Sequence, residues 1–203
     1  LDSGNILVAG RAHNGSDYDF ALARYDSDGT LDTTFGSSGK TTTDFGYGTD
    51  VILDLTVLAD GKIVVVGYAY SSTDEDFAIA RYHADGSLDI SFGSGGKTTT
   101  DFSDSTDKGF EVAVRVDGKL VVAGYAYNGS DYDFALARYN QDGGLDPGLT
   151  SVVTDLTNGT AYTFTVTATN SIGTSARSDA SNSVTTPTVP GAPTEASAMP
   201  ADV

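Results

Sequence analysis

The sequence predicts an all-β protein in which four-stranded antiparallel repeats follow one another in tandem. The first observation is a unit that recurs every 57 residues without an insertion. The second is that only three of the 28 acidic residues are Glu, whereas Asp, which favours turns and caps, supplies the rest. The third is that short apolar runs rich in β-branched and aromatic residues alternate with Gly-containing turns, as expected of strands.

Composition excludes several classes of protein and partner. The 203 residues carry 11 basic and 28 acidic side chains, which gives a net charge of −17. Such an anionic surface repels phosphate backbones, so we expect no nucleic-acid partner. No cysteine is available for a disulfide or a thiolate metal site, and His13 and His83 occupy unrelated positions of the repeat. No apolar run approaches the roughly 18 residues of a membrane span, so none is expected.

Several positions of the unit hold the same residue in all three copies. Equivalent positions are Gly4, Gly61 and Gly118; Gly10, Gly67 and Gly124; Phe20, Phe77 and Phe134; Arg24, Arg81 and Arg138; and Tyr25, Tyr82 and Tyr139. The third copy stops about halfway, so residues 1–147 hold two and a half units. Repetition at this period indicates supersecondary units that stack on their neighbours.

Each copy is expected to form about four strands. The first is apolar and β-branched, as in ILVAG, IVVVGYAY and LVVAGYAY. The second, DFALARY or DFAIARY, is apolar on both faces, as in a central strand, and an Asp-Gly hairpin turn follows it. The third is the Thr-rich KTTTDF, and the fourth is VILDLTVLAD or EVAVRVD. Four strands per unit fit a propeller blade or an open stack of sheets.

The string DGKIVVVGYAY…DFAIARYHADGSLDISFGSGGKTTTDF resembles the bacterial delta-60 repeat. The resemblance covers Leu1 to about Pro147 and implies a propeller-like fold, no assigned catalytic residue, and a place in large secreted or surface-exposed proteins. A closed propeller needs about four blades or more, and this chain supplies fewer than three. Either the chain is part of a longer array, or several chains complete one another, or the repeats stack openly.

The amino-acid composition and the residue pattern change after Pro147. In residues 148–187 the run LTNGTAYTFTVTATN alternates apolar and Thr side chains, which predicts a half-buried antiparallel strand. This segment resembles the C-terminal half of a bacterial fibronectin type III domain, a β-sandwich, with a tyrosine in the corner position. About three of some seven strands are present. Residues 188–203 are rich in Pro and Ala and suit a linker, an edge strand or a strand donated to a neighbour.

An incomplete sandwich leaves one apolar face without a covering sheet. In this segment that face carries Tyr162, Phe164 and Val166. We therefore expect these three residues to form an assembly surface, covered either by the repeat region or by strands from another copy.

The repeated turn DxDGxxD is the first candidate site, for calcium. Its oxygen ligands would be Asp26, Asp28, Asp32, Asp85, Asp89, Asp142 and Asp146. Carboxylates at alternate positions around a Gly turn can hold Ca²⁺, which prefers oxygen ligands. The alternative is a hairpin turn with side-chain caps. His83, a poor calcium ligand, begins the pattern in the second copy and favours that alternative. No other cofactor is expected.

The central strand begins with Asp19, Asp76 or Asp133 and ends with Arg24, Arg81 or Arg138. These residues predict ion pairs that fix the register between neighbouring units. The other interpretation is a row of arginines that binds carboxylates.

Three Asn-X-Ser/Thr sequences begin at Asn14, Asn128 and Asn158 and fit the pattern for N-glycosylation. Asn-Gly-Ser is also a common turn, so both interpretations are kept. No Ser-His-Asp order, nucleotide-binding Gly loop or HExxH sequence occurs, so we do not expect an enzyme.

The sequence thus predicts a non-catalytic structural protein of the bacterial cell surface or extracellular space. Its first expected function is as a self-assembling subunit of a fibre or matrix, a homopolymer joined by intersubunit β-strand complementation. The alternative is a fragment of a large secreted adhesin-like protein that binds glycans or another cell-surface protein.

Overall fold

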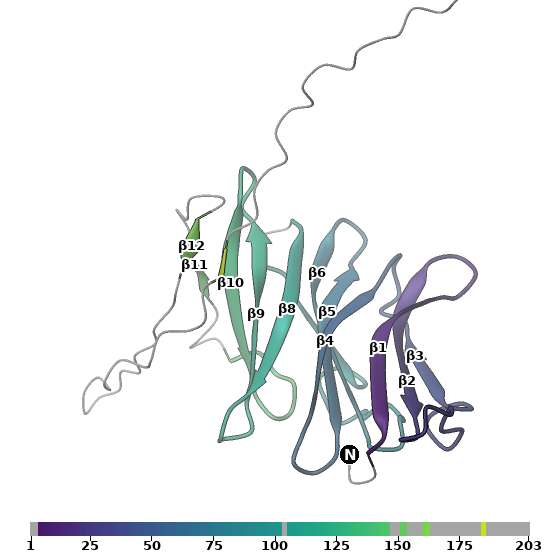
Figure 1. The fold of residues 1–203 in the computed structure, drawn as a ribbon. Coiled ribbons are helices and arrows are strands. Elements are labelled where there is room, and N and C mark those ends of the chain that lie inside the picture. Colours follow the sequence, from purple (N-terminus) through teal and green to yellow (C-terminus); the bar gives the residue numbers. More distant parts are fainter. Residues whose placement is uncertain (1–3, 103–104, 147–150, 154–159, 163–183, 186–203) are drawn as a thin grey trace, which may run out of the picture. The chain divides into compact units, whose positions relative to one another are not determined.

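The computed structural model describes residues 4–102, 105–146, 151–153, 160–162 and 184–185. The chain divides into two compact units, Leu1–Thr154 and Asp155–Val203. The first unit holds three antiparallel sheets that follow one another in chain order (Figure 1). No described segment forms an apolar helix of membrane-spanning length.

Eleven strands make up these three sheets. The first sheet contains β1 (Ile6–His13), β2 (Tyr18–Tyr25) and β3 (Lys40–Thr43). The second contains β4 (Val51–Val57), β5 (Ile63–Tyr70), β6 (Glu75–Tyr82) and β7 (Lys97–Thr100). The third contains β8 (Asp107–Val114), β9 (Leu120–Tyr127), β10 (Tyr132–Tyr139) and β11 (Ser151–Val153). Each sheet keeps its strands in sequence order, so the prediction of antiparallel sheets in tandem is confirmed, with three strands in the first sheet and four in the second and third.

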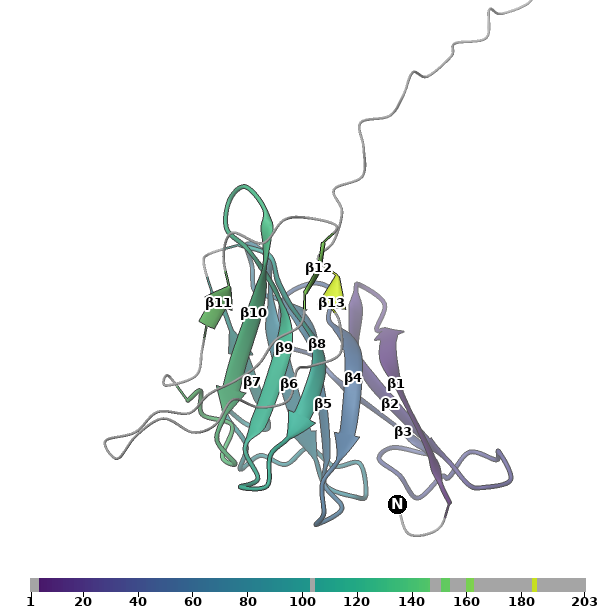
Figure 2. The same ribbon diagram turned by 60° about the vertical axis from the view of Figure 1, so that its left-hand side comes forward.

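The sheets are out of phase with the sequence repeat. The run VILDLTV, which ends the first 57-residue copy, forms β4 and pairs with β5 of the second copy. In the same way β8 pairs with β9. Each four-stranded sheet therefore takes its first strand from the copy before it. Figure 2 shows β8 beside β4, and a backbone-to-carboxylate hydrogen bond of 2.9 Å from Val112 to Asp54 joins the two strands.

Two apolar cores lie between the sheets because each central strand is apolar on both faces. The first core joins Phe20 and Leu22 of β2 to Ile63 and Val65 of β5. The second core joins the opposite face of β5 and β6 to β9 and β10. Its members include Val64, Val66, Phe77, Ile79, Leu120 and Val122. Alternate residues of one strand thus enter different cores, which is why neither face of the second sheet can be polar.

The third sheet ends on a strand that the sequence places elsewhere. The sequence assigns residues after 147 to the fibronectin-like segment, yet β11 pairs antiparallel with β10, with Val153 opposite Phe134. In the first two sheets the residue at this place is Thr43 or Thr100. Because Val and Thr are both β-branched, either fits the pleated edge of the sheet.

Glycine is required where β5 and β9 meet a β-bulge. The register of β4 against β5 shifts between Ile52 and Asp54, opposite Gly67. The register of β8 against β9 shifts between Gly109 and Glu111, opposite Gly124. A Cβ at Gly67 would overlap the carbonyl oxygen of Val51, so the bulge leaves no room for a side chain.

Little of the second unit is described. Its β12 (Ala161–Tyr162) and β13 (Val184–Thr185) form a two-stranded antiparallel pair. Tyr162, from the predicted assembly surface, lies on β12, whereas Phe164 and Val166 lie outside the described residues. The fibronectin resemblance and the predicted surface stay predictions.

Candidate functional site

The first group of functional side chains lies where one sheet meets the next. Arg81, at the end of β6, donates from Nε to Asp89 at 2.8 Å and from a terminal nitrogen to the carbonyl oxygen of Gln141 in the next unit. Arg24 repeats this arrangement with Asp32 and the carbonyl oxygen of Ala84. Each arginine therefore links an aspartate of its own unit to the backbone of the following one.

This geometry corrects the predicted pairing of Arg24, Arg81 and Arg138 with the aspartates that begin the central strand. The partners of these arginines are Asp32, Asp89 and Asp146, each eight residues further along the chain. Each arginine lies at the end of its central strand, beside the turn that follows, whereas the aspartates expected to pair with it from a neighbouring unit lie where the central strand begins. Register between units is instead fixed by the bonds to Ala84 and Gln141.

The Asp-Gly turn of one unit packs on the loop of the unit before it. The amide of Gly36 donates to the carbonyl oxygen of Asp85 at 2.7 Å, and Gly93 does the same to Asp142 at 2.6 Å. A buried hydroxyl adds to each junction. Tyr82 donates to Thr43 at 2.7 Å, and burial raises the pKa of this phenol to about 12.

A second group of side chains lies at the opposite end of the strands, where the chain passes from one sheet to the next. The first acidic cluster is Asp19, Asp44 and Asp50, and the second acidic cluster is Asp76, Asp101 and Asp107. Corresponding members are separated by one 57-residue period. Within each cluster the three carboxylates each offer an oxygen, and these oxygens lie within 4.8 Å of one another.

Burial of the clusters shifts their titration. Asp50 and Asp107 are fully buried, at 0% exposure. Burial raises the pKa of Asp50 to about 6, and the charges of Asp44 and Asp19 act in the same direction. Burial likewise raises the pKa of Asp107 to about 7, again assisted by its two neighbours in the cluster. Because water is excluded and the neighbours are acidic, the ionised form is disfavoured at both sites.

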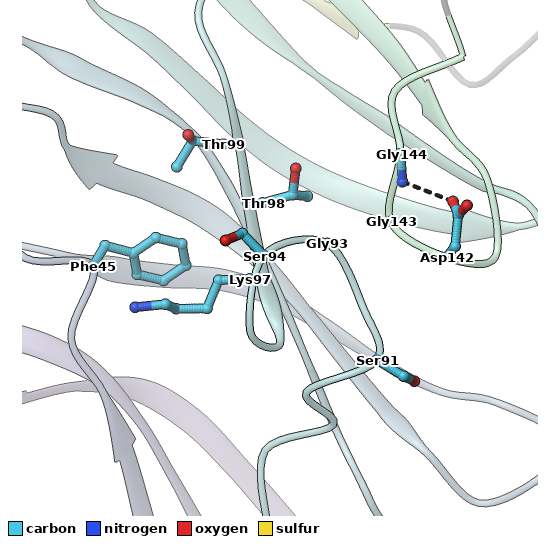
Figure 3. A pocket seen from close by; sticks show the side chains of 10 residues that line it. All are labelled: Phe45, Ser91, Gly93, Ser94, Lys97, Thr98, Thr99, Asp142, Gly143 and Gly144. Carbon is cyan, nitrogen blue, oxygen red and sulfur yellow. Dashed lines mark hydrogen bonds between the residues drawn. The ribbon is translucent and has the colours of Figure 1, made fainter.

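An open hollow of about 660 Å³ lies between the second and third sheets. Figure 3 shows Phe45 and Lys97 on one side of it and the turn of Asp142, Gly143 and Gly144 on the other. The Lys97 ammonium lies 5.1 Å from the centre of the Phe45 ring and donates to the carbonyl oxygen of Asp44. The lining is mainly Ser, Thr and Gly, which suits a hydroxylated ligand better than an apolar one.

Comparison with known proteins adds a family to this architecture. The family model described as "Domain of unknown function (DUF5122) beta-propeller" matches residues 2–35, 58–92 and 117–149, about half of the chain. The chain belongs to this family. Searches of curated proteins and of solved structures each found no match.

Membership of this β-propeller family agrees with the all-β tandem repeats and with the predicted delta-60 likeness. The three matched segments recur at the sequence period and each includes the first two strands of a copy together with its Asp-Gly turn. In each acidic cluster, the two aspartates that lie on the crossover between sheets fall outside the matched segments. These residues are Asp44, Asp50, Asp101 and Asp107.

The predicted calcium ligands lie in and just after the Asp-Gly turns that follow β2, β6 and β10. Asp28 accepts hydrogen bonds from the amide and hydroxyl of Thr30, which caps its turn, and Asp85 does the same with Ser87. Asp32, Asp89 and Asp146 pair with arginines. Asp26 accepts from the Thr30 hydroxyl at 3.5 Å, and Asp142 from the amide of Gly144. Calcium at these turns stays a prediction.

Two of the predicted glycosylation sites form turns. Asn14 accepts from the amides of Ser16 and Asp17, and Asn128 accepts from those of Ser130 and Asp131. Asn158 lies outside the described residues. Glycosylation therefore stays a prediction at all three positions.

Sequence reasoning missed the two acidic clusters because their members are far apart in the chain. The signal was nevertheless present in the repeat. Asp19, Asp44 and Asp50 recur together one period later, as Asp76, Asp101 and Asp107. A set of polar residues that recurs as a group indicates a shared site more strongly than single aspartates in turns.

We expect the stability of the chelator-treated chain to fall as pH rises. A carboxyl whose pKa is raised on folding stabilises the folded state fully only below its ordinary pKa of 3.8. That stabilisation is lost as the pH rises through the raised pKa, which is about 6 for Asp50 and about 7 for Asp107. Thermal unfolding followed by circular dichroism should give a melting temperature roughly 5 °C lower at pH 8 than at pH 5. An Asp107→Asn variant should flatten this dependence. A melting temperature that rises with pH would contradict the prediction.

Proposed function

We propose that the chain is a non-catalytic structural building block that joins other repeat sheets face to face, forming an extracellular fibre or matrix. The observation that carries this proposal is the outer face of the first sheet. Its Ile6 and Val8 are 50% and 49% exposed, whereas their equivalents Ile63 and Val65 are 0% exposed. The same face is therefore buried in a core in the second sheet and exposed to solvent in the first sheet.

The turn at this end of the stack is open as well. Gly86 and Gly143, one period apart, each lie against the phenylalanine ring of the preceding unit. Within the described residues, a Cβ at the equivalent Gly29 would meet nothing within 4 Å. Both the apolar face and the turn that make the internal junctions are thus present here, and no sheet of the described part of the chain covers them.

The occupant that fits this face is the third sheet of another copy. Its outer face carries Val121, Ala123 and Leu136, the equivalents of residues that cover the next sheet at both internal junctions. These three side chains are partly exposed. A contact between different faces of identical subunits is heterologous, and it builds an open filament when it does not close into a ring.

The surroundings expected for such a protein follow from composition and from the second unit. A net charge of −17 keeps a repetitive β-protein soluble until its specific contacts form. We place it outside the bacterial cell or on its surface, as the delta-60 likeness implies. The fibronectin-like segment, with Tyr162, Phe164 and Val166, would add a second contact through strand complementation.

Sedimentation velocity and negative-stain microscopy of the full chain test the assembly. We expect elongated oligomers that lengthen with concentration, and an Ile6→Glu/Val8→Glu variant that remains monomeric because it buries unpaired charge in the contact. Ile90→Glu is the matched control, since Ile90 is 77% exposed and belongs to neither core. A compact monomer at every concentration would contradict the proposal. If only Phe164→Glu abolishes assembly, the assembly depends on strand complementation by the fibronectin-like segment instead of on the face of the first sheet.

The alternative function, binding of a glycan or protein partner by an adhesin-like protein, is favoured by the hollow in Figure 3. Ser94, Thr98, Thr99 and Lys97 are among the residues that line it. Binding to a glycan array that is lost in Lys97→Ala, with unchanged sedimentation, would support this second function.

A further inference from the structure

We propose that each acidic cluster binds one divalent cation, and that this cation is Ca²⁺. The sites are the first acidic cluster (Asp19, Asp44, Asp50) and the second acidic cluster (Asp76, Asp101, Asp107). They are distinct from the DxDGxxD turns, which lie at the other end of the strands. The proposal concerns single chains and is independent of whether copies assemble.

The spacing of the carboxylates fits one ion. Calcium binds oxygen ligands at about 2.3–2.6 Å, so two ligands on opposite sides of the ion are up to roughly 5 Å apart. The three oxygens of each cluster lie within 4.8 Å of one another. In each cluster one aspartate is exposed, Asp44 in the first and Asp101 in the second. An ion can therefore reach the site and keep water as further ligands.

A buried oxygen of Asp107 points independently to a ligand. Oδ2 of Asp107 accepts a hydrogen bond from the amide of Phe102 at 2.6 Å. Oδ1 is buried and accepts no hydrogen bond of normal geometry, on a residue that is 0% exposed and whose carboxylate belongs to the cluster. The nearby backbone amide of Tyr127 donates instead to the carbonyl oxygen of Thr106 at 3.0 Å. A buried carboxylate oxygen without a donor is costly, and a cation among the three carboxylates would satisfy it.

Elsewhere in the chain, a buried aspartate has basic side chains as partners. Asp89 is 2% exposed and lies 2.8 Å from the guanidinium of Arg81 and 3.5 Å from the ammonium of Lys62. Among the described residues, no basic side chain forms an ion pair with Asp50 or Asp107. Two fully buried carboxylates beside further carboxylates therefore lack the counter-charge that the chain supplies elsewhere.

The ligand set selects the ion. Each cluster offers carboxylate oxygens and no imidazole or thiolate, which favours a hard cation over Zn²⁺ or Cu²⁺. Mg²⁺ demands near-ideal octahedral geometry and dehydrates reluctantly, whereas Ca²⁺ accepts irregular sites of six to eight oxygens. The mixture of buried and exposed carboxylates is an irregular site, so Ca²⁺ fits better.

The position of the clusters gives the ion a structural role. In the first cluster Asp19 belongs to β2, whereas Asp44 and Asp50 lie on the crossover that leads to β4 of the next sheet. Asp50 already holds this crossover through the amides of Phe45 and Tyr70. A bound ion would tie the strand, the crossover and the following sheet together, once per period.

Isothermal titration and thermal unfolding of the full, chelator-treated chain test the proposal with CaCl₂. We expect two sites per chain and a melting temperature raised by about 10 °C at saturating Ca²⁺, because an ion that binds only the folded state stabilises it. MgCl₂ at equal ionic strength should shift the melting temperature less than half as much. Asp44→Asn and Asp101→Asn, which change exposed members, should each remove one site, and the double variant should remove both.

Asp133→Asn is the matched control. Asp133 is the equivalent of Asp19 and Asp76 in the third copy, is 2% exposed, and accepts a hydrogen bond from Asn128. Because Asp133 belongs to neither of the two acidic clusters found among the described residues, this variant should keep both sites. The proposal is overturned if Ca²⁺ binds the double variant as it binds the parent chain, or if Asp85→Asn, in a turn, removes a site instead. No calcium binding to the parent chain would overturn it too.

Discussion

Replacing Gly67 with alanine is expected to lower the melting temperature by about 10 °C, which corresponds to roughly 3 kcal/mol in a domain of this size. The added methyl group would overlap the carbonyl oxygen of Val51 and lie 3.1 Å from the Cα of Ile52. Both contacts are to the backbone of β4, so no side chain can rotate away. Relief requires the bulge between Ile52 and Asp54 to open, which breaks pairing in the middle of the second sheet.

The chain supplies its own control for this substitution. Gly10 is the equivalent residue of the first sheet, and within the described residues a Cβ there would meet nothing within 4 Å. Gly10→Ala should therefore change stability by less than about 1 kcal/mol, since alanine costs less backbone entropy than glycine in a strand. Urea unfolding of both variants measures the difference. Equal destabilisation would show that loss of glycine itself, rather than the bulge, is responsible.

Arg81→Ala is expected to cost about 3 kcal/mol or more. The substitution leaves Asp89, 2% exposed, without its guanidinium partner. It also removes the hydrogen bond to Gln141 of the next unit and the stacking of the guanidinium 4.7 Å from the centre of the Phe92 ring. Lys62, 3.5 Å from Asp89, compensates for part of the lost charge but not for the planar hydrogen bonds.

Urea unfolding at neutral pH measures this effect, and Arg115→Ala is the control. The Arg115–Asp117 pair is 3.4 Å long, with side chains 47% and 43% exposed, so its loss should change stability by less than about 0.5 kcal/mol. Asp89→Ala in the Arg81→Ala background should cost less than the two single changes added together, because they share one interaction. Strict additivity would mean that the pair does not act as a unit.

The repeat, the strands and the antiparallel sheets could be predicted because each depends on local pattern. The DFALARY strand is apolar on both faces, and β2, β6 and β10 are indeed paired on both sides. The phase of the sheets could not be predicted, since VILDLTV pairs equally well in principle with the strand before it or after it. Only the three-dimensional crossover decides that β4 joins β5.

The candidate sites were harder to predict for a similar reason. Arg81 and Asp89 are close in sequence, but which aspartate an arginine meets depends on the end of the strand from which each side chain leaves. Hydrogen bonds from Ser91 and Arg81 hold the pKa of Asp89 well below its usual range although burial alone would raise it. The acidic clusters join positions about 25 and 31 residues apart, whose proximity follows from strand pairing rather than from spacing.

The shared strands also bear on how such a chain can change length. Because the second sheet draws its first strand from one copy and its other three strands from the next, no single copy holds all of that sheet. A duplication or deletion of one whole period therefore restores intact sheets wherever in the unit the break falls. Recombination between copies therefore needs no fixed boundary. The array can gain or lose one sheet at a time, and strand pairing is kept wherever in the repeat the break falls.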